Sequence, residues 1–168
     1  MGQAESIPLD TMKWVPFPAI LILAGLLACH TDTISMKPLD LHPYGIPMTI
    51  QAPDSTVITE KDYKFMRDLT LKKAPEFDIQ LFELTASSED AAGEKFHQLE
   101  SVRQDPYFRQ VIQEDEYGFI FSKYLDSLNV DYDFRVVKLI GDKELIFQTG
   151  LAGSFNLEQV KRMYDAVK

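Results

Sequence analysis

An apolar run near the start of the chain ends at its only cysteine and limits which residues can build a folded body. The run covers 14–28, fifteen residues without a charge, and Cys29 follows it. A membrane-spanning helix needs about 20 apolar residues, and this shorter run also contains Pro16 and Pro18, so a permanent span is not predicted. Because there is no second cysteine, no internal disulfide can stabilise the fold. The hydrophobic core must therefore hold the fold alone.

The same run has the layout of a secretory signal peptide. Met12 and Lys13 give a short basic start, the apolar segment follows, and Ala28 supplies the small residue at its end. This order of basic start, apolar segment and small residue is what a signal sequence requires. Residues 1–11 carry two acidic side chains and do not fit a signal start. We therefore expect 1–28 to be a signal peptide, with Met12 as the true initiator and 1–11 as a start-site artefact.

The tetrapeptide Leu26-Leu27-Ala28-Cys29 resembles the lipobox of bacterial lipoproteins. The resemblance implies signal cleavage between Ala28 and Cys29 and a diacylglyceryl group on the Cys29 sulfur, usually with a third acyl chain on its amine. Two or more acyl chains give stable membrane anchoring. In diderm bacteria an aspartate after the cysteine commonly retains the protein in the inner membrane. Position 30 is histidine, so the resemblance favours the outer membrane, facing the periplasm or the cell surface.

A different interpretation of Cys29 stays open. Free cysteine often behaves as a small buried hydrophobe, so the apolar run could be a core helix of a cytosolic protein. A conventional secretory signal or an uncleaved anchor is a further alternative. The stretch after the cysteine favours the lipoprotein, because 30–41 has no apolar periodicity and contains Pro38. We expect 29–43 to be a tether between the lipid and a folded domain.

The charge of the chain narrows the choice of partners. Without 1–28 the chain has 16 basic and 24 acidic residues among 140, a net charge near −8. Nucleic acid is not an expected partner, because phosphate binding requires a basic face. Adhesion to anionic lipid by charge is equally disfavoured, so the lipid on Cys29 must hold the chain to the membrane. At this length one domain is expected.

The first half of the domain reads as strands. Residues 46–52 alternate moderately and end at Pro53, which suits an opening strand. Residues 65–71 are ambiguous between helix and strand, with strand favoured, and 72–76 read as a hairpin connection. The other two predicted strands are 56–59, after a turn at Asp54-Ser55, and 77–84, where apolar and polar residues alternate cleanly.

Helices are predicted next. Ser87 and Ser88 offer an N-cap, and an apolar stripe at helical spacing follows at Ala92, Phe96, Leu99 and Val102. Asp105-Pro106 predicts the start of a second helix, with the aspartate as cap and the proline in the first turn. The apolar side of this second helix would be Phe108, Val111 and Ile112.

The last fifty residues give the firmest local predictions. Residues 117–124 are rich in aromatic side chains and read as a strand, and 134–140 and 144–149 form a hairpin about Gly141-Asp142. A final helix begins at the N-cap Asn156, with Gln159 three residues on and Phe155 able to pack on Val160. Its buried face would consist of Leu157, Val160, Tyr164 and Val167.

Hairpins with helices grouped between and after them indicate an α+β fold, an antiparallel sheet packed by helices. The opening strand at Tyr44-Gly45-Ile46-Pro47, the late hairpin and the closing helix are similar to the PsbP-like α/β/α sandwich. The resemblance covers 44–168 and implies a domain type found in extracytoplasmic lipoproteins and in an extrinsic photosystem subunit. It implies no particular activity.

Catalytic chemistry is not predicted. The three histidines, His30, His42 and His97, are scattered, and no metal-ligand spacing, serine elbow or phosphate loop is present. The cysteine is committed to lipid. Oxygen ligands recur at Asp126, Asn129, Asp131 and Asp133, as Ca²⁺ prefers. Phe134 stands where a calcium loop would want glycine, so a solvated loop entering a strand is favoured. No catalytic residue, cofactor or metal site is therefore assigned.

Two functions follow from these observations. The first is a non-enzymatic accessory lipoprotein that presents its domain to a protein of the cell envelope. The alternative is a carrier or sensor that holds a small apolar ligand between sheet and helices, lined by Phe119, Phe121, Phe134 and Phe147. A filled core with exposed apolar side chains would favour the first, and an enclosed apolar cavity of at least about 300 Å³ would favour the second. A hydrolase with dispersed residues is a weaker third.

Overall fold

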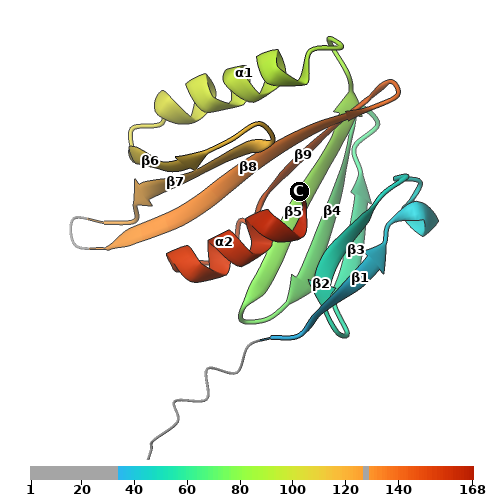
Figure 1. The fold of residues 1–168 in the computed structure, drawn as a ribbon, viewed down its shortest axis with the longest axis horizontal. Coiled ribbons are helices and arrows are strands. Elements are labelled where there is room, and N and C mark those ends of the chain that lie inside the picture. Colours follow the sequence, from blue (N-terminus) through green and yellow to red (C-terminus); the bar gives the residue numbers. More distant parts are fainter. Residues whose placement is uncertain (1–33, 127–128) are drawn as a thin grey trace, which may run out of the picture. The chain divides into compact units, whose positions relative to one another are not determined.

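The computed structural model describes residues 34–126 and 129–168, and these form a β-rich body built on antiparallel sheets (Figure 1). Seven strands lie in the order β3-β4-β5-β9-β8-β7-β6, and β1 and β2 form a separate two-stranded sheet. The predicted antiparallel sheet with helices is confirmed. The elements are β1 Met36–Asp40, the 3-10 turn η1 His42–Tyr44, β2 Thr49–Pro53, β3 Val57–Asp62, β4 Met66–Lys73, β5 Phe77–Thr85, α1 Ala91–Arg103, β6 Phe108–Glu114, β7 Gly118–Tyr124, β8 Val130–Ile140, β9 Lys143–Thr149 and α2 Leu157–Ala166.

The two helices pack on opposite faces of the large sheet. Phe119 and Phe121 of β7 form a small apolar cluster with Leu99 and Val102 of α1. Ile120, between them, belongs to the main core cluster together with residues of α2 and of the β1–β2 pair. Successive residues of a strand point to opposite faces, so α1 covers one face and α2 with β1–β2 covers the other. The helices stand on either side of the sheet in Figure 1.

Helix α2 confirms its prediction in detail. The Asn156 side chain accepts a hydrogen bond from the Gln159 backbone N–H at 3.0 Å, and the Gln159 side chain accepts one from the Asn156 N–H at 2.9 Å. This capping box satisfies two backbone donors that the helix cannot satisfy itself. Val160, Tyr164 and Val167 are fully buried and Leu157 is partly buried against the same core, so the predicted apolar face is the one that packs on the sheet.

The predicted strands are largely confirmed. Strands β3, β4, β5 and β7 cover the regions expected at 56–59, 65–71, 77–84 and 117–124, and a hairpin connection lies between β4 and β5. The late hairpin is β8–β9, with Gly141 at φ +62° in its turn. Glycine adopts this left-handed conformation without the steric cost of a side chain.

The second predicted helix is wrong. Phe108–Glu114 forms the edge strand β6, paired with β7. Asp105 does act as a cap, but its carboxylate accepts a hydrogen bond from the Tyr107 N–H at 2.8 Å and makes a turn. Pairing of β6 with β7 shifts register twice, and Phe108 and Val111, three residues apart, both pack against the cluster under α1. The simple alternation that marks a strand is thereby lost.

Two boundaries also differ from the prediction. The described part of the expected tether 29–43 is folded: Met36–Asp40 is β1, paired with β2, and Leu41 is fully buried. Pro38 is tolerated because β1 is an edge strand. The strand expected at 46–52 begins only at Thr49.

Helix α1 begins later than expected and buries only part of its stripe. Its N-cap is Asp90, whose carboxylate accepts a hydrogen bond from the Ala92 N–H, whereas Ser87 and Ser88 donate to Glu94. Leu99 and Val102 are buried as predicted, but Ala92 and Phe96 are exposed.

Asp115 ties the β6–β7 turn to the end of α2. Its carboxylate accepts hydrogen bonds from the Tyr164 hydroxyl at 2.7 Å and from the N–H groups of Tyr117 and Gly118, and it lies 2.7 Å from the Lys168 Nζ. Burial alone would raise the pKa of Asp115, but hydrogen bonds from Lys168 and Tyr164 lower it to about 2. The C-terminus is therefore fixed to the sheet by a carboxylate that stays ionised.

We expect Asp115→Asn to lower the free energy of unfolding by about 1–2 kcal/mol at pH 7, after allowance for solvent screening. Because the folded pKa lies below the ordinary value, this stabilisation is present above about pH 4 and is lost as the pH falls towards 2. Urea unfolding at several pH values should show the difference between wild type and variant shrinking over that range. Asp165→Asn, at an exposed carboxylate 3.6 Å from the same lysine, is the control and should change little.

Candidate binding surface

The residues predicted for lipid attachment, Leu26 to Cys29 with the cleavage site at Ala28 and Cys29, lie outside the described residues. The other candidates can be located. Of the predicted ligand-lining phenylalanines, Phe119 and Phe121 pack under α1, whereas Phe134 and Phe147 belong to the core on the α2 face. All four are buried, and two lie on each side of the sheet. They therefore do not line one common cavity, which corrects the expectation of the carrier hypothesis.

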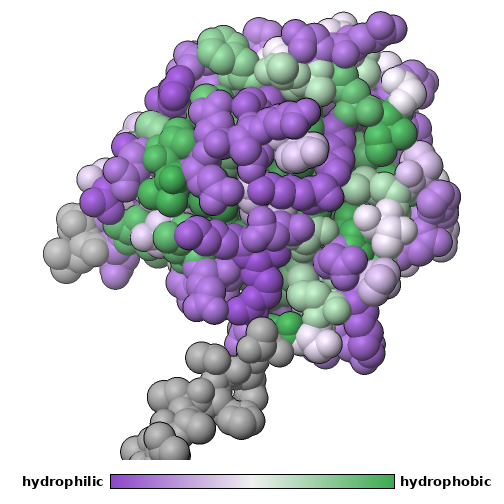
Figure 2. All heavy atoms as spheres, in the orientation of Figure 1, coloured by the Kyte–Doolittle hydropathy of each residue, from purple (hydrophilic) through white to green (hydrophobic). Residues whose placement is uncertain are grey.

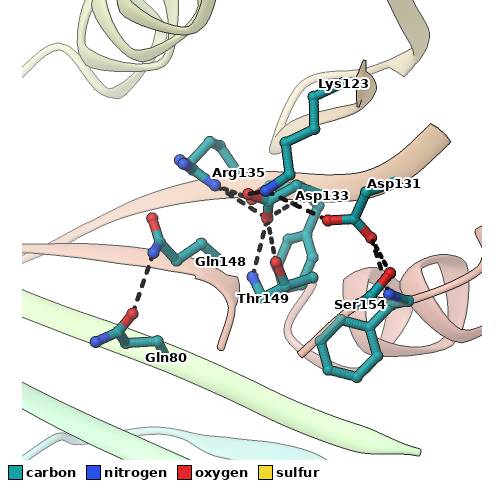
Figure 3. Close-up of polar contacts among 10 residues, drawn as sticks. Gln80, Lys123, Asp131, Asp133, Arg135, Gln148, Thr149 and Ser154 are labelled. Carbon is teal, nitrogen blue, oxygen red and sulfur yellow. Dashed lines mark hydrogen bonds and ion pairs between the residues drawn. The ribbon is translucent and has the colours of Figure 1, made fainter. Parts of the chain in front are cut away.

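The acidic group at 126–133 is a solvated loop entering a strand only in its first part: Asp126 and Asn129 are exposed ahead of β8, and the expectation is corrected for the two residues that follow. Asp131 and Asp133 lie on β8 and are buried (Figure 3). The Lys123 Nζ, from β7, lies 3.5 Å from each carboxylate, and Arg135 lies 3.1 Å from Asp133. Two buried carboxylates thus face two cationic side chains, an arrangement that compensates the cost of burying charge.

This network holds the connection between β9 and α2. The Asp133 Oδ1 accepts hydrogen bonds from the Thr149 hydroxyl at 2.6 Å and from its N–H at 3.1 Å. The Asp131 Oδ1 accepts from the Ser154 hydroxyl at 3.1 Å and from the Phe155 N–H at 2.9 Å. Burial alone would raise the pKa of Asp133, but Arg135 and Lys123 lower it. The carboxylates have a structural role at the start of α2.

A second polar chain crosses the middle of the sheet. The Gln148 amide donates to the Gln80 oxygen at 3.1 Å (Figure 3). The Gln80 amide in turn donates to Asp68 at 2.9 Å. These residues join β9, β5 and β4 and are buried. Across 34–126 and 129–168, no group of three or more His, Cys, Asp or Glu side chains is arranged to hold a metal ion. In the same ranges no helix is long and apolar enough to cross a membrane.

Apolar side chains on the surface lie mainly at turns and strand ends. On the face shown in Figure 2 hydrophobic residues reach the surface in separate groups between hydrophilic ones. The large exposed hydrophobic residues are Val57, Tyr63, Phe65, Phe96, Tyr107, Tyr117, Tyr124, Leu125 and Leu151. Two of the aromatic ones, Tyr63 and Phe65, stand together in the turn between β3 and β4, and Phe65 is 78% exposed.

The Tyr63–Phe65 turn has a defined backbone. The Asp62 carboxylate accepts a hydrogen bond from the Lys64 N–H at 2.7 Å, and the Tyr63 N–H donates to the Met66 carbonyl at 2.9 Å. Lys64 adopts φ +69°. An aspartate that bonds the backbone two residues on is a common turn device. The turn therefore presents Phe65 on a hydrogen-bonded support.

A cleft of about 250 Å³ lies beside this turn. Its walls come from the turn, the end of β5 and the β8–β9 turn, and its lining residues are Asp62, Lys64, Phe65, Met66, Arg67, Glu83, Leu84, Thr85, Asp142 and Lys143. Glu83 pairs with Arg67 and, at 2.7 Å, with Lys143, while Arg67 also bonds Glu60 at 3.0 Å. Burial alone would raise the pKa of Glu83, but these two cations lower it. An ion-pair network therefore fixes the floor of the cleft.

The opposite end of β3 and β4 carries a different cleft, of about 440 Å³. It is lined by Ile34 and Ser35, where the described chain begins, and by the β2–β3 and β4–β5 turns. The Tyr63–Phe65 turn and the start of the described chain therefore lie at opposite ends of the same hairpin. Strand β4 has eight residues, so the two ends are about 25 Å apart.

This surface was not predicted from the sequence. Phe65 was expected at the start of an ambiguous strand, and no role was predicted for any residue of 60–64. A signal was present, because the aspartate of Asp62-Tyr63-Lys64-Phe65 can start a turn. The sequence did not predict that Glu83 and Asp142 line this cleft, because only the pairing of β5 with β9 brings them beside the turn. No protein-family model, curated protein or solved structure matches the chain.

Proposed function

We propose that this chain is an envelope lipoprotein whose folded domain is a non-enzymatic accessory module that binds a protein partner. The lipobox-like Leu26-Leu27-Ala28-Cys29 supports lipid attachment at Cys29, and the histidine at position 30 supports the outer membrane. The observation that carries protein binding is the display of Phe65, 78% exposed beside a cleft. The packing of the four predicted ligand phenylalanines into the core lends support to a partner over an enclosed apolar ligand.

The position of the helices supports the finer fold hypothesis. With α1 on one face of the antiparallel sheet and α2 on the other, we propose a layered arrangement of the PsbP-like kind. Domains of one fold differ widely in role, so the fold hypothesis adds nothing to the choice of partner. The functional proposal rests on the N-terminal motif and on the exposed surface.

Cys29→Ala should abolish lipid attachment. We expect the wild-type chain in the membrane fraction, with a mass equal to residues 29–168 plus acyl groups, because two or more acyl chains anchor stably. The variant should keep residues before 29 and should lose the acyl mass. Intact-mass spectrometry and membrane fractionation with a detergent phase separation measure both effects. An unmodified cysteine in the mature wild-type chain would contradict the anchor.

Partner binding is tested by isolating the chain from its native envelope in mild detergent, followed by chemical crosslinking and mass spectrometry. Recovery of one protein in stoichiometric amount is the expected result. A retained small molecule without a protein partner would favour the carrier alternative. Cys29→Ala is the matched control, since a partner whose binding depends on lipid attachment should be recovered less when the acyl groups are absent.

A further inference from the structure

Strand β3 is an open and regular edge of the seven-stranded sheet. It stands first in the strand order, and all six of its residues pair with β4 without a register shift. The opposite edge, β6, pairs with two register shifts, and the edge strand β1 of the small sheet contains Pro38. Bulges and prolines are devices that keep an edge from pairing with another chain. Strand β3 has neither, and all its residues except the half-buried Ile58 are exposed.

The pairing with β4 determines which backbone groups of β3 point outward. The Tyr63 N–H donates to the Met66 carbonyl at 2.9 Å. Bonded and non-bonded pairs alternate along an antiparallel ladder, so Ile58, Glu60 and Asp62 direct their N–H and C=O groups away from β4. In the part of the chain that the structure describes, no turn, loop or other strand forms a backbone hydrogen bond with these three residues. The edge therefore offers alternating donors and acceptors at the spacing of a strand.

The charged side chains of β3 are arranged by face. Side chains alternate along a strand, so Lys61 points to one face of the sheet, and Glu60 and Asp62 point to the other. Glu60 pairs with Arg67 at 3.0 Å. Lys61 and Asp62 have no ion-pair partner within 34–126 and 129–168. An added strand with an acidic residue opposite Lys61 and a basic residue opposite Asp62 would complement both charges.

This arrangement disfavours a second copy of the chain as the added strand. Residues directly opposite in an antiparallel pair share a face. Two β3 strands joined in that way would place Lys61 opposite residues of its own face, and none of these is acidic. On the other face they would bring Glu60 and Asp62 of the two copies together, and like charges directly opposite are destabilising. Parallel pairing is slightly less stable per residue. A lipid surface has no peptide groups with which to complete the ladder.

Resting on the proposed function, we infer that β3 binds the protein partner by strand addition, in which an extended segment of the partner pairs with the outward backbone groups of β3. In this mode main-chain hydrogen bonds give affinity and alternating side chains give specificity. The segment carries an acidic residue opposite Lys61 and none opposite Asp62. Its two ends contact exposed apolar side chains, Val57 at the start of β3 and Tyr63 with Phe65 after its end.

The variants Glu60→Pro and Glu60→Ala separate the backbone from the side chain. Both remove the ion pair with Arg67, but only proline removes the outward N–H. Because that N–H is not bonded to β4, proline is tolerated at this edge position. The two variants should therefore have nearly the same melting temperature. Their difference in partner binding then reports the backbone hydrogen bond and the space beside it.

Photocrosslinking in intact cells measures that binding. A benzophenone amino acid replaces Thr59 in the full-length chain, and in a second version it replaces Leu125, which is 58% exposed after β7. We expect a discrete protein adduct from position 59 and none from position 125. Glu60→Ala should leave the adduct at position 59 unchanged, and Glu60→Pro should reduce it at least about tenfold. The crosslinked peptide should contain an acidic residue.

Amide hydrogen exchange gives a second measurement, made on the full-length chain in detergent with the purified protein that position 59 captures. The N–H groups of Ile58, Glu60 and Asp62 should exchange fast in the free chain and slowly in the complex. Those of Thr59 and Lys61, which bond β4, should be protected in both. This alternation decides the inference whether or not the proline variant folds. Protection that does not alternate would mean that the partner covers β3 without pairing with it, and would overturn strand addition.

The outcomes separate this inference from the proposed function. Strand addition is overturned by a lipid adduct, by an adduct with a second copy of this chain, or by a protein adduct at position 59 that Glu60→Pro reduces no more than Glu60→Ala does. A protein adduct at position 125 without one at position 59 would preserve protein binding and overturn only the role of β3. No protein adduct at either position would overturn both.

Discussion

Asp133→Ala should lower the free energy of unfolding by about 3–5 kcal/mol, the range for removal of one partner of a buried ion pair. The carboxylate is buried and accepts hydrogen bonds from both the hydroxyl and the N–H of Thr149. Without it, Arg135 loses its ion pair with Asp133, and Lys123 keeps its ion pair with Asp131. Two partly buried cations then face one carboxylate in place of two. The Thr149 hydroxyl also loses its acceptor at this position. Urea unfolding followed by circular dichroism measures the loss.

The pH dependence gives an independent check on Asp133. Arg135 and Lys123 lower its pKa in the folded protein although burial opposes them. A lowered folded pKa stabilises the protein above the ordinary pKa near 4 and loses that effect at lower pH. The difference in the free energy of unfolding between wild type and Asp133→Ala should therefore become smaller at acidic pH. Asp54→Ala, which breaks the exposed ion pair with Lys37, is the control and should change the free energy of unfolding little. If Asp133→Ala lowered the free energy of unfolding no more than Asp54→Ala does, the structural role of the Asp133 carboxylate would be refuted.

Local signals in the sequence predicted those elements whose determinants lie close together in the chain. Helix α2 has its cap, its capping partner and its apolar face within twelve residues, from Asn156 to Val167. The β8–β9 hairpin has its turn glycine between two strands of clear pattern. In both cases short-range chemistry and tertiary packing favour the same structure, so the prediction succeeds.

The prediction failed where one local sequence signal is compatible with two different structures. Asp105-Pro106 can start a helix or a turn, and the register shifts in β6 removed the alternation that would have identified a strand. The acidic residues on β8 were read as exposed because their cations are not all local: Lys123 belongs to β7. A period-two pattern was nevertheless present, since Asp131, Asp133 and Arg135 alternate with Tyr132, Phe134 and Val136. The candidate binding surface depends on strand pairing and has the weakest signature of all.

Gly118→Ala should destabilise the fold by about 3 kcal/mol or more, because the new methyl group would collide with backbone. A Cβ at position 118 would lie 2.0 Å from the Arg135 carbonyl oxygen and 2.9 Å from the Val136 Cα. Gly118 pairs with Val136 at the start of β7, and its own N–H donates to Asp115. To make room for the methyl group, β7 and β8 would have to separate. That movement would break the Gly118–Val136 pairing and the hydrogen bond from Gly118 to Asp115. Thermal and urea unfolding report the change.

Gly141→Ala provides the matched comparison, since the same substitution there meets nothing within 4 Å. Its cost arises only from φ +62°, a conformation that disfavours a side chain by about 1–2 kcal/mol. Gly141→Asn should cost less still, because asparagine tolerates this region. Gly118 should tolerate neither residue, since its constraint is space and not backbone conformation. Equal losses at the two positions would mean that β7 and β8 do not approach as closely at Gly118 as the pairing requires.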